Sequence, residues 1–267
     1  MSCNSCHVLT SFGVDHLPFS PGDDGELGGR NSPTVLNAAL HVAQFWDGRA
    51  ADVEEQAGMP VLNPVEMAIP DEAFLVERLS ETPGYLEAFR AAFPEDDPPI
   101  DYSNIRLALA AFERTLLTPS RFDAYLEGDR TALDAREIAG LERFMELGCT
   151  ACHNGATVGA RFFRKFGLND SYWVHTGSAA PDEGRFLQTG DPEDRYVFKV
   201  ASLRNVAETA PYFHDGSVST LPEAVRIMAR LQVGVELGPS EAEDIAAFLA
   251  SLTGRVPASA LEGAKAP

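Results

Sequence analysis

The chain has 267 residues, of which 45% are hydrophobic, and it carries 40 acidic against 21 basic side chains. The formal charge of −19 argues against a nucleic acid as partner, because phosphate backbones are bound by basic surfaces. No apolar run reaches the length of a membrane span, so no transmembrane segment is expected. The acidic surface suits a basic donor protein, or simple solvation, equally well.

The first informative element is the pattern C-x-x-C-H, which occupies residues 3–7 and returns at residues 149–153. In c-type cytochromes, two such cysteines join the vinyl groups of one haem and the adjoining histidine binds the iron. A zinc site would need a second Cys/His pair nearby and a redox dithiol would accompany a βαβ pattern, and the sequence has neither. We therefore expect two covalently bound haem c groups. All four cysteines of the chain, Cys3, Cys6, Cys149 and Cys152, are the attachment points, and His7 and His153 are the proximal iron ligands.

Between the two patterns, punctuation and 3.6-residue periodicity predict helices separated by long irregular connections. Residues 3–31 and 48–70 are predicted to be largely loop. The predicted helices are residues 32–46, opened by Ser32-Pro33, one from Asp71, a short one from Thr82-Pro83, and residues 102–117, after a break at residues 96–99.

The second half continues in the same way. Asp134 and Glu137 form a capping-box pattern that starts a helix, and Gly148 ends it directly before the second haem-binding pattern. Residues 154–210 are expected to be mostly loop, with extended pieces near residues 196–198. Two further helices are predicted, one over residues 221–231 and a last one capped by Ser240 and Glu243.

These elements predict an all-α fold of two cytochrome c-like haem domains with long irregular loops. We place the boundary at Thr118-Pro119, which gives an N-terminal domain of residues 1–118 and a C-terminal domain of residues 119–254. Residues 255–267 are expected to form a disordered tail.

Haem c is attached outside the bacterial cytoplasm, so a periplasmic protein with a secretory signal is expected. Met1 lies only two positions before Cys3, which leaves no room for a signal peptide. The chain is therefore interpreted as N-terminally truncated.

Three strings outside the haem-binding patterns carry further information: residues 43–49 (AQFWDGR), residues 63–67 (NPVEM) and residues 203–216, which end in PYFHDG. With the two patterns in this order, they resemble the bacterial di-haem cytochrome c peroxidases, which are related to the MauG-type enzymes. The resemblance implies reduction of hydrogen peroxide to water with electrons from a small soluble donor, a cytochrome c or a copper protein. In that family the N-terminal haem is peroxidatic and the C-terminal haem passes electrons to it. Family members are often homodimers.

The resemblance also assigns catalytic residues. Glu66 matches the acid–base glutamate, which peroxide cleavage needs to move a proton between the two oxygens. Gln56 matches a glutamine near the same pocket that can hydrogen-bond peroxide. Trp46 matches the tryptophan between the two haems, where it is expected to carry electrons. A solvated glutamate and a core aromatic are the ordinary alternatives for Glu66 and Trp46.

Metal ligands follow from the same comparison. Met228 stands where the family places the axial methionine of the second haem, whereas the MauG-type enzymes have tyrosine there. A methionine at helical spacing is otherwise a core residue. One calcium ion is implied, held by the side chain of Asn31 and the carbonyls of Thr209 and Pro211. His214 is expected to contact a haem propionate, and His41 and His175 match no functional position.

One departure from the family concerns the resting state of the first haem. Many members have a histidine 16 positions after the proximal one as a sixth ligand, and this chain has Asp23 there. His16 is the other histidine of that loop, and it remains an alternative sixth ligand of the first haem. The preferred hypothesis is a five-coordinate or water-bound first haem, active without prior reduction. The alternatives to a peroxidase are a di-haem electron-transfer protein and a MauG-like oxidase without peroxide turnover.

Overall fold

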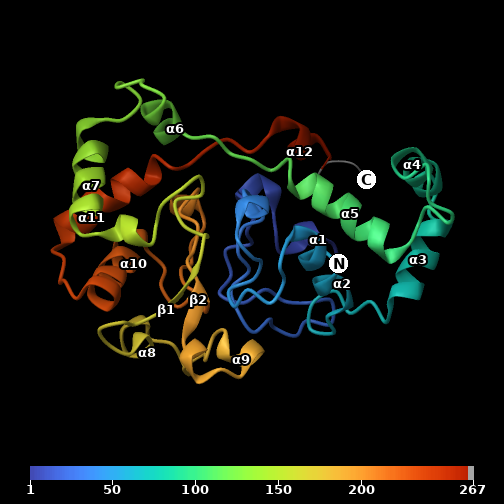
Figure 1. Ribbon diagram of the computed structural model, residues 1–267, viewed down its shortest axis with the longest axis horizontal. Helices are drawn as coiled ribbons and strands as arrows, with labels where there is room; N and C mark the ends of the chain where they lie inside the picture. Colours follow the sequence, from blue (N-terminus) through green and yellow to red (C-terminus); the bar gives the residue numbers. More distant parts are fainter. Residues whose placement is uncertain (264–267) are drawn as a thin grey trace.

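The computed structural model describes residues 1–263, and residues 264–267 lie outside that part. The molecule is mostly helical, with two groups of helices side by side and long loops between them (Figure 1). One group holds α7 (Ala135–Glu146), α10 (Leu221–Met228) and α11 (Pro239–Ala250), and the other holds α1 (Val53–Gln56), α2 (Met59–Leu62) and α5 (Tyr102–Glu113). The described residues form a single two-stranded antiparallel sheet, β1 (Phe163–Lys165) and β2 (Val197–Lys199), so the extended piece predicted near residues 196–198 is present. Within residues 1–263 no helix has the length and apolar character needed to cross a membrane.

The helices predicted after residue 70 in the first half are confirmed. The carboxylate of Asp71 accepts from the Phe74 amide, and that of Asp101 accepts from the Asn104 amide, so each caps the helix that follows it. Phe89, Ile100 and Ile105 form the buried core that these helices share. The helices of this half are α1 (Val53–Gln56), α2 (Met59–Leu62), α3 (Glu72–Glu81), α4 (Tyr85–Ala92) and α5 (Tyr102–Glu113).

The helix predicted for residues 32–46 is wrong, because this stretch contains only a 3₁₀ turn at Ala38–Leu40. Asn37 and Phe45 adopt left-handed backbone conformations with φ of 61° and 63°, which interrupt any helix. The Asn37 amide is 2% exposed and bonds to Thr118, 81 positions away. Long-range hydrogen bonding therefore overrides the local helical pattern.

The second half begins as predicted. Asp134 and Glu137 cap α7 reciprocally, because each side chain accepts the backbone amide of the other. Helices α7 and α11 then pack closely at Gly140, where a Cβ would lie 1.9 Å from the carbonyl oxygen of Asp244. The helices of this half are α6 (Arg121–Leu126), α7 (Ala135–Glu146), α8 (Tyr172–Thr176), α9 (Phe186–Thr189), α10 (Leu221–Met228), α11 (Pro239–Ala250) and α12 (Ala258–Gly263).

Two details at the end of the chain differ from expectation. Helix α11 begins at Pro239, and its cap pairs Gly238 with Glu241 in place of Ser240 with Glu243. The tail is not disordered over residues 255–263, because the chain crosses back to the first half and forms α12 (Figure 1). Ala260 is 1% exposed and packs with Leu9, Leu36 and Leu116. The expectation for residues 264–267 lies outside the described residues.

A buried polar cluster ties the two halves together at the predicted boundary. The side-chain amides of Asn37 and Asn205 both donate to Oγ1 of Thr118, at 2.8 and 2.9 Å. Oδ1 of Asn205 in turn accepts the amide of Gly254 at 2.9 Å. Because Thr118 and Asn205 are at most 1% exposed, this cluster fixes where the chain passes from one half to the other.

Candidate active site

The two C-x-x-C-H segments have the same local geometry. Each begins with a 3₁₀ turn, Cys3–Ser5 in the first and Cys149–Ala151 in the second. In each, the histidine amide donates to the carbonyl of the first cysteine at 2.9 Å. The turn places the histidine one turn after that cysteine, so thiols and imidazole come from one compact unit.

The imidazole of each segment is oriented by a backbone carbonyl. Nδ1 of His7 lies 3.4 Å from the carbonyl oxygen of Gly13, and Nδ1 of His153 lies 3.3 Å from that of Val158. A carbonyl only accepts, so Nδ1 carries the proton and Nε2 keeps a free lone pair, as an iron ligand requires. Burial lowers the pKa of both imidazoles, that of His153 to about 4, which keeps them neutral.

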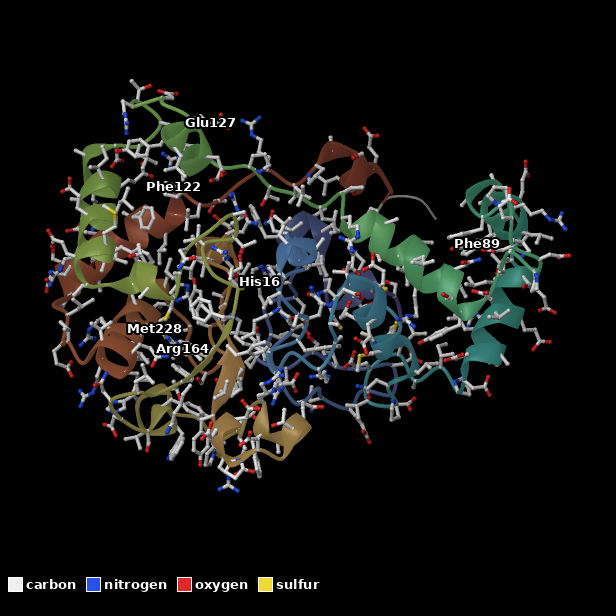
Figure 2. The ribbon with its side chains drawn as sticks, viewed as in Figure 1. His16, Phe89, Phe122, Glu127, Arg164 and Met228 are labelled. Carbon is white, nitrogen blue, oxygen red and sulfur yellow. The ribbon has the colours of Figure 1, made fainter. Side chains whose placement is uncertain are left out.

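A cavity of about 570 Å³ adjoins the second segment. Cys149, Cys152 and His153 line it, together with Met228 at the end of α10. Figure 2 marks Met228 beside that helix. Leu221, Ala224 and Val225 present the same helix face to the cavity, so its wall is largely apolar. Two thiols, an imidazole and a thioether around an apolar space of this size fit a haem.

A second cavity, of about 390 Å³, contains Glu66. Oε1 of Glu66 accepts from Nδ2 of Asn63 at 2.8 Å, an arrangement set by the turn at residues 63–66. Burial raises the pKa of Glu66, while Arg49 and the Asn63 hydrogen bond act in the opposite direction. A partly buried carboxyl of this kind is suited to exchange protons. The lining residues are Phe45, Arg49, Met59, Leu62, Asn63, Glu66 and Tyr102.

Gln56 is not among the residues that line either cavity. It ends α1, and the lining residue Met59 begins α2 three positions later. The structure therefore places Gln56 near the Glu66 cavity without bringing its side chain to the wall.

Phe45 and Trp46 lie where the two cavities approach each other. Phe45 lines both cavities, and Trp46 lines the larger one. Nε1 of Trp46 donates to the carbonyl oxygen of Asn31 at 2.9 Å. Its ring meets the ring of His214 edge-on, with centroids 6.3 Å apart. The indole is thus held in one orientation between the two halves.

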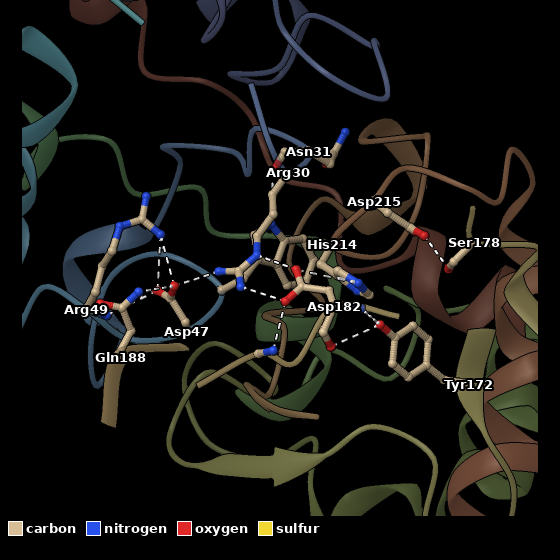
Figure 3. A network of polar contacts seen from close by, with 12 residues as sticks. Arg30, Asn31, Asp47, Arg49, Tyr172, Ser178, Asp182, Gln188, His214 and Asp215 are labelled. Atoms are coloured by element: carbon tan, nitrogen blue, oxygen red, sulfur yellow. Dashed lines mark hydrogen bonds and ion pairs between the residues drawn. The ribbon is translucent and has the colours of Figure 1, made fainter. Parts of the chain in front are cut away.

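An ion network that includes Asp47, the residue after Trp46, joins the halves (Figure 3). Arg30 donates to Asp47 at 2.6 Å and to Asp182 at 2.6 and 2.9 Å. Asp47 also accepts from Arg49, which lines the Glu66 cavity. Sequence reasoning missed Arg30 and Asp182, because no local pattern links positions 152 residues apart. Nε2 of His214 lies 3.9 Å from Oδ2 of Asp182, and it is buried without a hydrogen-bond partner among the described residues.

The three residues expected to hold calcium, Asn31, Thr209 and Pro211, all line the larger cavity. Nδ2 of Asn31 donates to the carbonyl of Leu17 at 2.8 Å, which turns the amide oxygen away from that contact. Oxygen donors of this neutral type suit calcium. Among residues 1–263 there is no group of three or more His, Cys, Asp or Glu side chains that could hold a metal.

The loop that carries Asp23 packs against the segment that carries Glu66. The Asp23 amide donates to the Glu66 carbonyl at 2.7 Å, and Gly22 lies under the Val65 carbonyl. Both ring nitrogens of His16 are engaged, Nε2 with Oγ of Ser11 at 2.7 Å and Nδ1 with the Ala210 carbonyl at 2.9 Å.

The two remaining histidines differ in setting. Nε2 of His175 contacts a carboxylate oxygen of Asp170 at 2.6 Å on the surface. His41 is partly buried beside Lys199.

Comparison with known proteins gives consistent matches over nearly the whole chain. The profile of the family described as di-haem cytochrome c peroxidase matches residues 1–131. The cytochrome c551 peroxidase of Pseudomonas aeruginosa is 48% identical over 262 residues, covering 96% of this chain and 74% of that protein. The cytochrome c551 peroxidase of Nitrosomonas europaea is 45% identical over 259 residues, covering 96% and 75%. The crystal structure of a MauG-like protein associated with microbial copper homeostasis matches with a TM-score of 0.83 at 31% identity, covering 96% of this chain and 84% of that one.

Proposed function

This chain belongs to the di-haem cytochrome c peroxidase family, and we propose that it reduces hydrogen peroxide to water with electrons from a small soluble donor protein such as a cytochrome c. The observation that carries the proposal is the placement of Glu66, which faces a cavity and is oriented by Asn63. A protein that only transfers electrons has no need of an acid–base group in such a place.

We assign the haem ligands to this chain's own residues. Cys3 and Cys6 attach the first haem and Cys149 and Cys152 the second, each through thioether bonds. Nε2 of His7 and of His153 would each bind one haem iron, and the sulfur of Met228 would be a further ligand to the second. When bound, the haem iron supplies the binding site for peroxide and accepts and donates the electrons.

The proton chemistry rests on Glu66. Its Oε1 is engaged by Asn63, so Oε2 is the atom that would take a proton from one peroxide oxygen and return it to the other. The Arg49 guanidinium favours the charged form of the Glu66 carboxyl group. Glu66 must be in this form before it can accept a proton. A hydrogen bond from Gln56 to peroxide stays part of the proposal, and it would require the side chain at the end of α1 to turn toward the cavity, which it does not line.

The electron route runs between the cavities. Phe45 and Trp46 occupy the space between them, and the Trp46 indole is fixed by its bond to Asn31. We assign Trp46 as the relay from the second haem to the first. Because the indole is held in one orientation, its distance to each haem would stay constant during turnover.

Further assignments concern calcium and assembly. A calcium ion bound by Asn31, Thr209 and Pro211 would brace the junction where both halves meet, because Thr209 and Pro211 belong to the second half. The periplasm is the compartment that fits haem c attachment. A homodimer remains part of the proposal for the active form.

The resting first haem is five-coordinate or water-bound in our proposal. The Asp23 carboxylate is a poor ligand for low-spin haem iron, and both nitrogens of His16 are engaged by other partners. An optical or EPR spectrum of the oxidised holoprotein with two purely low-spin haems would contradict this assignment.

The test is steady-state peroxide reduction by holoprotein matured in a periplasm, with reduced cytochrome c as donor. Turnover without pre-reduction of the enzyme is expected. A mass that corresponds to fewer than two attached haems, or peroxide consumption equal to that of Glu66→Gln, would contradict the proposal.

A further inference from the structure

Lys199 on β2 lines the larger cavity. Its ammonium group donates to the carbonyl of Ala43 at 2.8 Å and approaches Nδ1 of His41 at 3.3 Å. The Lys199 backbone amide donates to the carbonyl of Trp46 at 2.8 Å. This one residue of the second half therefore clamps the first-half segment that carries Trp46.

Lys199 and His41 have donor capacity that the described protein groups do not use. An ammonium has three N–H donors, and two of them account for Ala43 and His41. Because an ammonium only donates, Nδ1 of His41 is the acceptor of this hydrogen bond. The neutral imidazole of His41 therefore carries its proton on Nε2. Nε2 is buried and has no partner within residues 1–263. An acceptor is thus missing at this part of the wall.

Within residues 1–263 no carboxylate forms an ion pair with this cation. Asp47 is the carboxylate whose charge acts on Lys199, but its own oxygens accept from Arg30, Arg49 and Gln188 (Figure 3). Burial lowers the pKa of Lys199 to about 8, so the group is partly removed from water while it remains largely charged at neutral pH. A partly buried cation of this kind is stabilised by an anion from outside the protein.

We propose that Lys199, assisted by the Nε2–H of His41, binds a haem propionate in the cavity between the two halves. The inference rests on the proposed haem binding, since the haem is the anionic group that belongs in this cavity. Lys199 acts as a positioning residue, because it holds the propionate and the Trp46 segment at once. Its positive charge also disfavours the ferric iron relative to the ferrous, so its loss lowers the midpoint potential of that haem.

The test is potentiometric titration of holoprotein, in which the two haems are followed by their separate spectra. Lys199→Gln is expected to lower the midpoint potential of one haem by about 59 mV. At a fixed solution potential this raises the ferric-to-ferrous ratio of that haem roughly tenfold, for a one-electron step. The haem whose potential moves is the one that contributes the propionate. Lys199→Arg keeps the charge and is expected to retain the potential. Lys165→Gln is the matched control, since Lys165 is an exposed residue of β1 that does not line the cavity.

Unchanged potentials of both haems in fully loaded Lys199→Gln would overturn the proposal. If that variant fails to load haem, His41→Phe tests the same site, with a smaller shift in the same direction expected and no shift overturning it. Haem content and peroxide turnover of the wild type, measured on the same preparations, separate the two ideas. A wild type without two haems would overturn the proposed function together with this proposal, whereas an intact wild type with unshifted variants overturns this proposal alone.

Discussion

The indole nitrogen of Trp46 is bonded to the carbonyl oxygen of Asn31, at 2.9 Å. The backbone N–H of Asn31 donates to the backbone carbonyl of His214, in the other half, at 2.7 Å. One residue therefore links the proposed electron relay, the proposed calcium site and the histidine beside Trp46. A disturbance of Asn31 is expected to reach the relay through this bond.

Trp46→Phe is expected to slow electron transfer between the haems. Phenylalanine keeps the aromatic packing but loses the N–H bond to Asn31 and is harder to oxidise. Turnover should fall roughly tenfold or more, which corresponds to about 1.4 kcal/mol in the barrier. Stopped-flow oxidation of the pre-reduced enzyme by peroxide measures the step. Trp173→Phe is the control, because Trp173 packs against Tyr172 and Tyr196 and lines neither cavity, and equal rates in both variants would contradict the assignment.

Asn31→Ala is expected to weaken calcium binding, because it removes one oxygen ligand. Affinity follows the number and charge of such ligands, so the Kd should rise by roughly tenfold or more. Calorimetric titration of chelator-treated holoprotein gives the value. Asn31→Asp keeps an oxygen at the same position and should bind calcium at least as well as the wild type. Equal Kd values for wild type and Asn31→Ala would exclude Asn31 as a ligand.

Glu66→Gln removes the proton acceptor but preserves the shape of the side chain. A positioned acid–base group contributes on the order of 10²–10⁴ in rate, and kcat for peroxide reduction should fall by such a factor. Glu77→Gln, at an exposed position on α3, should leave kcat unchanged. The spectra of the two haems should be alike in both variants. A Glu66→Gln enzyme with wild-type kcat would show that another group moves the proton.

Arg49→Gln tests how the charge of Glu66 is controlled. Burial already raises the pKa of Glu66, and Arg49 opposes that shift by favouring the carboxylate. Without the guanidinium the pKa of Glu66 rises further, so a smaller fraction is deprotonated at a given pH. The acidic limb of kcat/KM against pH should therefore move to higher pH. Arg114→Gln, which breaks the ion pair with Glu54 on the surface, should leave the limb in place. If the acidic limb stays at the same pH in both variants, it does not report the ionisation of Glu66.

Local features of this fold were predictable from sequence, and long-range ones were not. The capping pair Asp134 and Glu137 lies within one turn, so sequence alone located the start of α7. The same holds for the two C-x-x-C-H turns, whose geometry is internal to five residues. Helix α12 could not be predicted, because it is stabilised by residues as distant as Leu9. The helix predicted at Asn37 is wrong for the same reason, because the conformation of Asn37 depends on its hydrogen bond to the distant Thr118.

The candidate site divides in the same way. Asn63 and Glu66 are three positions apart, and their bond follows from one turn of the chain. Arg30 and Asp182 come from different halves, and Lys199 reaches Ala43 over 156 positions. Such pairs have no periodicity or spacing to indicate them. The polar pairs that join the two halves are therefore visible only in three dimensions.

Thr118→Val tests the cluster that joins the halves. Valine has nearly the shape of threonine, so packing is preserved while the acceptor of both the Asn37 and the Asn205 amide is removed. Each buried donor left without a partner costs about 1–3 kcal/mol, so with two donors the free energy of unfolding should fall by a total of about 2–6 kcal/mol. Urea unfolding of the holoprotein, followed by far-ultraviolet circular dichroism, measures the loss. Thr118→Ser retains the hydroxyl and should lose much less, and Thr115→Val, at an exposed site, should change stability by at most about 0.5 kcal/mol. If the valine and serine variants at position 118 were equally stable, the hydroxyl would not be what satisfies the two amides.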